Sequence, residues 1–254
     1  MSPLWRVASI LSWCLAGLVL TLAQPLLLLL LVATRPFDPE RRLVARVFRG
    51  LGASIVGLQP WVRVRVENKA TTPFAEPCII VSNHESDADV YVSAYLALRG
   101  WNAKYLSKET LFELPVVGWG MRMAGDIEVV RTDRRSRAEA FIKCRAWLER
   151  GVPVVIFPEG TRSRTGEMAP FQPGAFRLAI ELGVPIQPIV FAGTRDALPP
   201  GEFLLRPARV VLRILEPVPV KGLDVAEGAA LADRVHDLVL AERDEIRRGL
   251  DGYS

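Results

Sequence analysis

Short apolar runs alternate with amphipathic stretches along most of this chain. Residues 78–82 and 151–157 form continuous apolar runs of the length that a buried strand needs, and residues 61–67 alternate valine with arginine as a half-buried strand does. Amphipathic patterns predict helices over residues 135–150 and 226–250. Strands that alternate with helices in this way indicate an α/β fold with one mixed sheet flanked by helices. Further helices are predicted over residues 89–98, 114–123 and 174–182, and further strands over residues 184–191 and 208–215.

The N-terminal part of the chain has a different pattern. Residues 7–33 contain no charged side chain and are long enough to cross a hydrocarbon core of roughly 30 Å. Gln24 and Pro25 interrupt the run, which therefore predicts either one kinked span or two shorter helices that enter one leaflet and return. A cleaved signal peptide is the alternative, but the run is long for that role and lacks a clear cleavage site.

Arginine is concentrated just after the apolar run, where it occupies positions 35, 41, 42, 46 and 49, whereas Arg6 precedes the run. The positive-inside rule then places the rest of the chain on the cytoplasmic side of a membrane. Residues 37–58 predict an amphipathic helix, which either lies on anionic headgroups or packs on the folded domain.

The first candidate for chemistry is His84, which directly follows the apolar run 78–82 and Asn83. Histidine can take up and return a proton near neutral pH, and a carboxylate on its second ring nitrogen would fix the tautomer. Asp89 is such a carboxylate. On one continuous helix the two side chains would point roughly 140° apart. We therefore expect His84 in a loop and a helix that begins near residues 85–87, so that Asp89 can turn back toward the ring.

The second candidate is the segment Phe-Pro-Glu-Gly-Thr-Arg-Ser at residues 157–163, which follows the apolar run 151–157. Polar and glycine residues directly after a strand are typical of ligand sites in open α/β sheets. Gly160 permits close backbone approach, and Arg162 offers a planar set of donors suited to phosphate or carboxylate.

Four segments together resemble the glycerolipid acyltransferase family, which contains the 1-acyl-sn-glycerol-3-phosphate acyltransferases. They occur in the family's order between residues 76 and 195: Asn83-His84 with Asp89, Gly-Asp-Ile-Glu-Val-Val-Arg at 125–131, residues 157–163, and Val-Pro-Ile-Gln-Pro at 184–188. Residues 108–119 also look like the family's connecting segment. The second segment departs from the commonest form, because Val130 stands where an acidic residue is usual before Arg131.

The resemblance implies transfer of an acyl group from acyl-CoA or acyl-carrier protein to the free hydroxyl of lysophosphatidic acid, which gives phosphatidic acid. His84, oriented by Asp89, would act as the general base without an acyl-enzyme, a cofactor or a metal. The remaining site residues would bind the acceptor or support the transition state, with the two arginines and the lysine on its phosphate: Lys108, Arg131, Glu159, Gly160, Thr161 and Arg162. Backbone N–H groups near Gly160 and Thr161 would stabilise the oxyanion.

This interpretation divides the chain into a membrane-anchoring element over residues 1–58 and a catalytic domain over residues 59–254. The net charge of +4 favours an anionic phospholipid surface, and no lysine stripe with interleaved aromatic residues indicates nucleic-acid binding. The three cysteines lack metal-ligand spacing and indicate reduced thiols, consistent with a cytoplasmic face.

Three alternatives stay open at this point. The same chemistry could serve a lyso-ornithine lipid or another lysophospholipid. His84, Glu85, Asp87 and Asp89 could instead form the metal site of a hydrolase. Nothing else in the sequence supplies a matching ligand cluster, however, and residues 157–163 would then be unexplained. The chain could also be a membrane-bound scaffold, although a scaffold has no need for the His84 and Asp89 pair.

Overall fold

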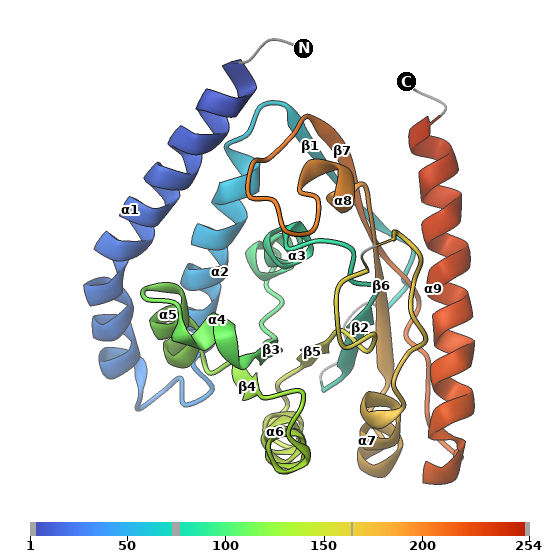
Figure 1. Cartoon of the computed structure of the whole chain (residues 1–254). Helices are drawn as coiled ribbons and strands as arrows, with labels where there is room; N and C mark the ends of the chain where they lie inside the picture. The colour runs from blue at the N-terminus through green and yellow to red at the C-terminus, as the bar shows by residue number, and fades with distance from the viewer. Residues whose placement is uncertain (1–3, 73–76, 164, 252–254) are drawn as a thin grey trace.

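The computed structural model describes residues 4–72, 77–163 and 165–251 and shows a seven-stranded sheet with helices on both faces (Figure 1). The strands are β1 (Val62–Asn68), β2 (Ile79–Ser82), β3 (Lys104–Lys108), β4 (Ile127–Val129), β5 (Val154–Ile156), β6 (Ile186–Ala192) and β7 (Ala208–Ile214). The helices are α1 (Leu4–Thr34), α2 (Arg42–Gly57), α3 (Ala88–Leu98), α4 (Glu109–Glu113), α5 (Val117–Ala124), α6 (Arg134–Leu148), α7 (Gly174–Leu182), α8 (Thr194–Ala197) and α9 (Gly228–Asp251), with a 3₁₀ turn, η1 (Val225–Glu227), before α9.

The strand order in the sheet is β1-β7-β6-β2-β5-β3-β4. Only the β6 and β7 pair is antiparallel among these neighbours, so the sheet is mixed as the sequence predicts. Because β2 and β5 are parallel neighbours, their carboxyl ends lie at the same edge. The two polar segments at residues 83–89 and 157–163 therefore meet in space.

Alternating side chains of the central strands pack into two separate cores. In β2, Ile79 and Val81 contact the core beneath α6, α7 and α9, whereas Ile80 contacts the core beneath α2 and α3. Figure 1 shows these two groups of helices on opposite sides of the sheet. Burial on both faces explains why β2 and β5 are continuously apolar in sequence, as parallel strands between two helical layers are.

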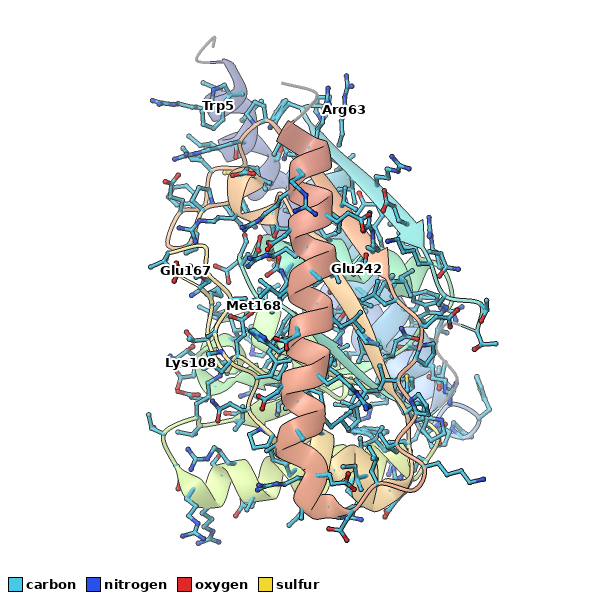
Figure 2. All side chains as sticks on the ribbon, turned by 90° about the vertical axis from the view of Figure 1, so that its right-hand side faces the viewer. Trp5, Arg63, Lys108, Glu167, Met168 and Glu242 are labelled. Carbon is cyan, nitrogen blue, oxygen red and sulfur yellow. The ribbon has the colours of Figure 1, made fainter. Side chains whose placement is uncertain are left out.

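The C-terminal helix α9 crosses one face of the sheet over its whole height (Figure 2). Glu242, labelled there, accepts a hydrogen bond from Nη1 of Arg213 in β7 at 2.6 Å and from Nζ of Lys69 at 2.8 Å. Nε of Arg213 also donates to Glu67 of β1 at 2.8 Å. These charged groups attach α9 to the β1–β7 edge of the sheet.

Helix α1 is continuous through Pro25 and does not divide into two helices. Among the described residues, Trp5–Thr34 is the one helix long and apolar enough to cross a membrane, and 17% of its most apolar stretch is buried. It packs against α2, which begins at Arg42 rather than at residue 37 because the Asp38 carboxylate accepts the backbone N–H groups of Arg42 and Leu43 at 2.9 and 2.8 Å. The long apolar face that remains uncovered supports association with a membrane.

Candidate active site

The turn that carries His84 is fixed to the sheet by the residue before it. Nδ2 of Asn83 donates to the Phe191 carbonyl at 2.8 Å, and Oδ1 of Asn83 accepts the Phe191 N–H at 2.9 Å. These two side-chain bonds connect Asn83 to β6 directly after Ser82, the last paired residue of β2. His84 is therefore positioned directly by the end of a buried strand.

His84 and Asp89 form the expected pair. Nδ1 of His84 lies 2.8 Å from Oδ2 of Asp89, and both residues are buried. The chain reaches this geometry as predicted, with His84 in a loop and α3 beginning at Ala88. The same Asp89 oxygen accepts the backbone N–H groups of Glu85 and Ser86 at 2.8 and 2.9 Å. Because Asp89 occupies Nδ1, the free nitrogen Nε2 is the one able to accept a proton.

The segment after β5 holds the His84 turn from the other side. Oε1 of Glu159 accepts the His84 N–H at 2.7 Å, and Oε2 accepts the Ala169 N–H at 3.0 Å. The Ser163 N–H donates to the His84 carbonyl at 3.0 Å, and the Phe157 ring stacks on the imidazole at a centroid distance of 4.1 Å. Glu159 thus bonds the protein main chain with both oxygens and holds the His84 turn in place.

Two arginines lie at the other end of the site. Nη1 of Arg131 donates to the Gly160 carbonyl, and Nη1 of Arg162 pairs with the carboxylate of Asp87. Burial lowers the pKa of Arg131, the negative charge of Glu109 raises it, and the positive charge of Arg162 lowers it. Arg162 and Asp87 keep 39% and 46% of their side-chain surface exposed, so a ligand can reach this pair.

The other predicted site residues are more peripheral. Lys108 is exposed at the end of β3, and Thr161 is exposed in the turn after β5. Gly160 has a φ of 74°, a left-handed conformation that favours glycine, and its N–H donates to the Phe157 carbonyl at 3.1 Å. The Gly160 N–H is therefore already used within the turn.

The four residues proposed as a metal site do not converge. Oδ2 of Asp89 binds His84, Asp87 pairs with Arg162, and Glu85 bonds Arg247 of α9 at 2.8 Å. Across residues 4–72, 77–163 and 165–251, no group of three histidine, cysteine, aspartate or glutamate side chains is arranged to hold a metal ion. The directions of these carboxylates favour the pairings seen over a shared ligand set.

An apolar cavity of about 250 Å³ opens beside Asp87, the residue that pairs with Arg162. Its walls come mainly from α1, α2, α3 and α5, and include Trp13, Phe48, Tyr91 and Met121. Asp87 lies in the same wall, so the cavity reaches the residue that pairs with Arg162. Sequence patterns did not predict this cavity, because four helices that are separate in the sequence build it.

The acyltransferase family model matches residues 63–192, which is the segment that contains all of these side chains except those of α1, α2 and α9. The chain belongs to the acyltransferase family. This assignment agrees with the order of the four sequence segments, and it places His84 and Asp89 within the part that defines the family.

Individual relatives of this family member are 1-acyl-sn-glycerol-3-phosphate acyltransferases. The chloroplastic protein BAT2 of Brassica napus is 35% identical over 207 residues, which cover 79% of this chain and 59% of that protein. The chloroplastic LPAT1 of Arabidopsis thaliana is 35% identical over 205 residues, which cover 78% and 56%. The chain thus spans less than two thirds of the length of these relatives.

A solved structure matches over nearly the whole chain. The crystal structure of the 1-acyl-sn-glycerophosphate (LPA) acyltransferase PlsC from Thermotoga maritima has a TM-score of 0.78 and 25% sequence identity, and the match covers 96% of this chain and 98% of that one. The predicted α/β fold with its flanking helices and N-terminal helical element is confirmed by this likeness.

Proposed function

We propose that this chain transfers an acyl group from a thioester donor, acyl-CoA or acyl-carrier protein, to the free hydroxyl of lysophosphatidic acid and so forms phosphatidic acid. The observation that carries the proposal is one site with three parts: a buried His84–Asp89 pair, two arginines that contact Gly160 and Asp87, and an apolar cavity that reaches Asp87. The names of the relatives, all of them acyltransferases for 1-acylglycerol-3-phosphate, support the same acceptor.

The chemistry follows from the free nitrogen of His84. Nε2 takes the proton of the acceptor hydroxyl while that oxygen attacks the thioester carbonyl, and Asp89 stabilises the imidazolium that forms. The Thr161 N–H, in the turn beside Gly160, is the donor that we assign to the oxyanion. Collapse of the tetrahedral intermediate then breaks the C–S bond, and the thiolate leaves with the proton from His84. No acyl-enzyme is needed, because the acyl group arrives already activated.

Substrate placement uses the other two parts of the site. Arg131 and Arg162 bind the acceptor phosphate by charge-assisted hydrogen bonds, with Lys108 contributing charge at the rim. The acyl chain of the donor lies in the apolar cavity. Each methylene group buried there contributes roughly 0.8 kcal/mol to the free energy of binding. Gly17 and Gly52 line this cavity, and a Cβ at Gly52 would lie 3.9 Å from Cδ1 of Tyr91.

Membrane association follows from α1 in this proposal. Its uncovered side chains, among them Leu11, Leu22 and Leu29, are each more than 60% exposed and apolar, so the helix inserts into a phospholipid surface. By the positive-inside rule, the arginines that follow α1 support a cytoplasmic location for residues 59–254.

The test is acyl transfer by the detergent-purified full chain, with thiol release and mass spectrometry of the lipid product. Oleoyl- and palmitoyl-CoA and the matching acyl-carrier proteins are offered with lysophosphatidic acid and other lysolipids, and His84→Ala is the control. We expect phosphatidic acid, lost in the variant. If only another lysolipid were acylated, that lipid would be the acceptor in place of lysophosphatidic acid. Hydrolysis of the thioester without an acylated lipid would refute the proposal.

A further inference from the structure

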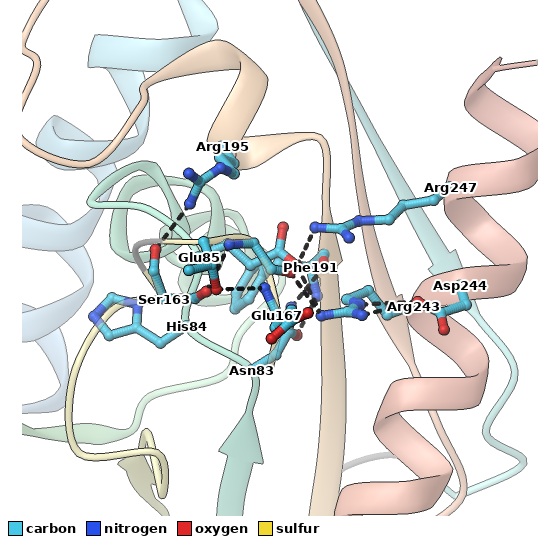
Figure 3. A network of polar contacts seen from close by, with 12 residues as sticks. Asn83, His84, Glu85, Ser163, Glu167, Phe191, Arg195, Arg243, Asp244 and Arg247 are labelled. Carbon is cyan, nitrogen blue, oxygen red and sulfur yellow. Dashed lines mark hydrogen bonds and ion pairs between the residues drawn. The ribbon is translucent and has the colours of Figure 1, made fainter. Parts of the chain in front are cut away.

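Glu85 directly follows His84, and its side chain is bonded to Arg247 of α9 (Figure 3). Oε1 accepts a hydrogen bond from Nη2 of Arg247 at 2.8 Å and lies 3.7 Å from Nη1 of Arg243. The Glu85 side chain is only 2% exposed. A buried carboxylate is costly unless it is paired, so the two arginines of α9 are what allow Glu85 to carry a charge there.

One of these arginines, Arg243, also reaches the segment after β5. Nη1 of Arg243 donates to the Gly166 carbonyl at 3.3 Å, and the Gly166 N–H donates to Oγ of Ser163 at 2.9 Å. Ser163 in turn donates its N–H to the His84 carbonyl and accepts a hydrogen bond at its own carbonyl from Arg195 at 2.8 Å. Helix α9 therefore contacts both segments that hold His84.

Helix α9 also has attachments other than the Glu85 contact. The helix is attached to the sheet through Glu242 and Arg213, and its apolar side packs into the core beneath β2 and β6. The Glu85 contact differs from these attachments because the backbone of Glu85 also bonds the catalytic pair. The Glu85 N–H donates to Oδ2 of Asp89 at 2.8 Å, the same oxygen that contacts Nδ1 of His84.

We propose that Glu85 is a positioning residue for the acyl transfer: its carboxylate, paired with Arg247 and Arg243, anchors the His84 turn to α9 and keeps the Glu85 N–H on Asp89. This inference rests on the proposed function. It assigns the arginines of α9 a part in catalysis, although α9 lies outside the segment that the family model matches.

The charge of Glu85 changes near neutral pH. Burial raises the pKa of Glu85 to about 7, and the nearby negative charge of Asp89, at the start of α3, also raises it. The charges of Arg247 and Arg243 on α9 lower it. As the pH falls through about 7, Glu85 takes up a proton, its pairing with the arginines weakens, and the turn loses its anchor.

The experiment compares kcat/KM of the wild-type chain and Glu85→Gln across pH. His84 and Asp89 are present in both proteins, so the ratio of their activities reports on residue 85. We expect the wild type to be about 10-fold faster at about pH 8, where Glu85 is charged, and the ratio to fall toward one at about pH 6, where wild-type Glu85 is itself neutral. A ratio that stays the same at both pH values would overturn the proposal.

A second variant keeps the test independent of Glu85 itself. Arg247→Met removes a charge that lowers the pKa of Glu85, so the pH at which activity declines should rise by about one unit. Arg248→Met is the matched control, because Arg248 is the exposed next residue on the same helix. Superimposable profiles for Arg247→Met and the wild type would also overturn the inference.

Thermal unfolding separates this inference from the proposed function, because it needs no substrate. A folded-state pKa raised above the usual glutamate value of about 4.3 contributes stability below that value, and the contribution is lost as the pH rises through about 7. The midpoint of the wild type should therefore fall relative to that of Glu85→Gln between about pH 5 and pH 8. A parallel pH dependence of the two midpoints would refute the titration even if the substrate assignment were wrong.

Discussion

At one end of the site His84 and Asp89 are buried and bonded to the main chain. At the other end Arg131 donates to the Gly160 carbonyl, and Arg162 pairs with Asp87 at a partly exposed position. We call these the base end and the arginine end. At the base end, Oδ2 of Asp89 has three contacts of 2.8 to 2.9 Å, and Glu159 bonds the backbone on both sides. At the arginine end, the Asp87 carboxylate occupies Arg162.

The difference matches the two tasks that acyl transfer sets. A general base works best when its geometry is fixed before the substrate arrives, because reorganisation during the reaction then costs nothing. In the proposed reaction the phosphate site exchanges partners at every turnover, and the acceptor phosphate would displace Asp87 from Arg162. The base end should therefore govern kcat, and the arginine end should govern KM.

Removal of the base should have the largest effect. His84→Ala leaves no proton acceptor beside Asp89, and we expect kcat to fall by about 10³-fold, within the range for general-base catalysis. Thiol release with saturating lysophosphatidic acid measures it. His236→Ala is the matched control, because His236 is the other histidine of the chain and its ring packs against Phe171, with 5.2 Å between the ring centroids. Equal losses in the two variants would show that the effect comes from folding.

A smaller loss is expected when His84 stays and its partner changes. Asp89→Asn keeps the shape of the side chain but cannot stabilise the imidazolium, so kcat should fall about 10²-fold while KM stays nearly constant. Steady-state kinetics over a range of acceptor concentrations separate the two constants. An unchanged kcat would mean that the 2.8 Å contact between Nδ1 and Oδ2 has no catalytic role.

At the arginine end the effect should move to KM. Arg162→Ala removes one charge-assisted contact to phosphate, and we expect KM for the acceptor to rise about 10-fold. Arg162→Lys keeps the charge without the planar fork and should give a smaller rise. If Arg162→Ala lowered only kcat, the assignment of Arg162 to ground-state phosphate binding would be wrong.

The smallest predicted effect runs in the opposite direction. Asp87→Asn removes the carboxylate that competes for Arg162, and KM for the acceptor should fall about twofold to fivefold, as expected for a partly exposed ion pair. Asp87 makes no side-chain capping bond to α3, so the exchange leaves the helix start intact. A KM that rises in this variant would show that Asp87 orients Arg162 rather than blocks it.

The base end could be predicted from the sequence because it is local. A buried apolar run, a histidine after it and an aspartate five residues later fix a strand, a loop and a helix start, and β2, His84 and α3 follow this order. The pairings at residues 85 and 87 could not be predicted in this way. Arg247 and Arg162 lie far away in the chain, and periodicity does not say which charges meet.

The N-terminal helix shows a further limit of sequence patterns. Gln24 and Pro25 suggest a break, yet α1 continues through both. Proline removes one intrahelical hydrogen bond, and a helix of 31 residues keeps the others. The cavity beneath α1 could not be predicted from the sequence either, because its walls depend on how α1, α2, α3 and α5 pack.

The most direct test of the two-ended site is the ratio of kcat/KM for lysophosphatidic acid to that for the matching monoacylglycerol, which lacks the phosphate. We predict that the wild type prefers the phosphate-bearing acceptor by about 10²-fold, as expected for two charge-assisted contacts. The Arg131→Ala, Arg162→Ala double variant should lose most of this preference, and Asp89→Asn should keep it while both rates fall. Loss of the preference in Asp89→Asn, or its survival without the two arginines, would contradict the separation of the base end from the arginine end.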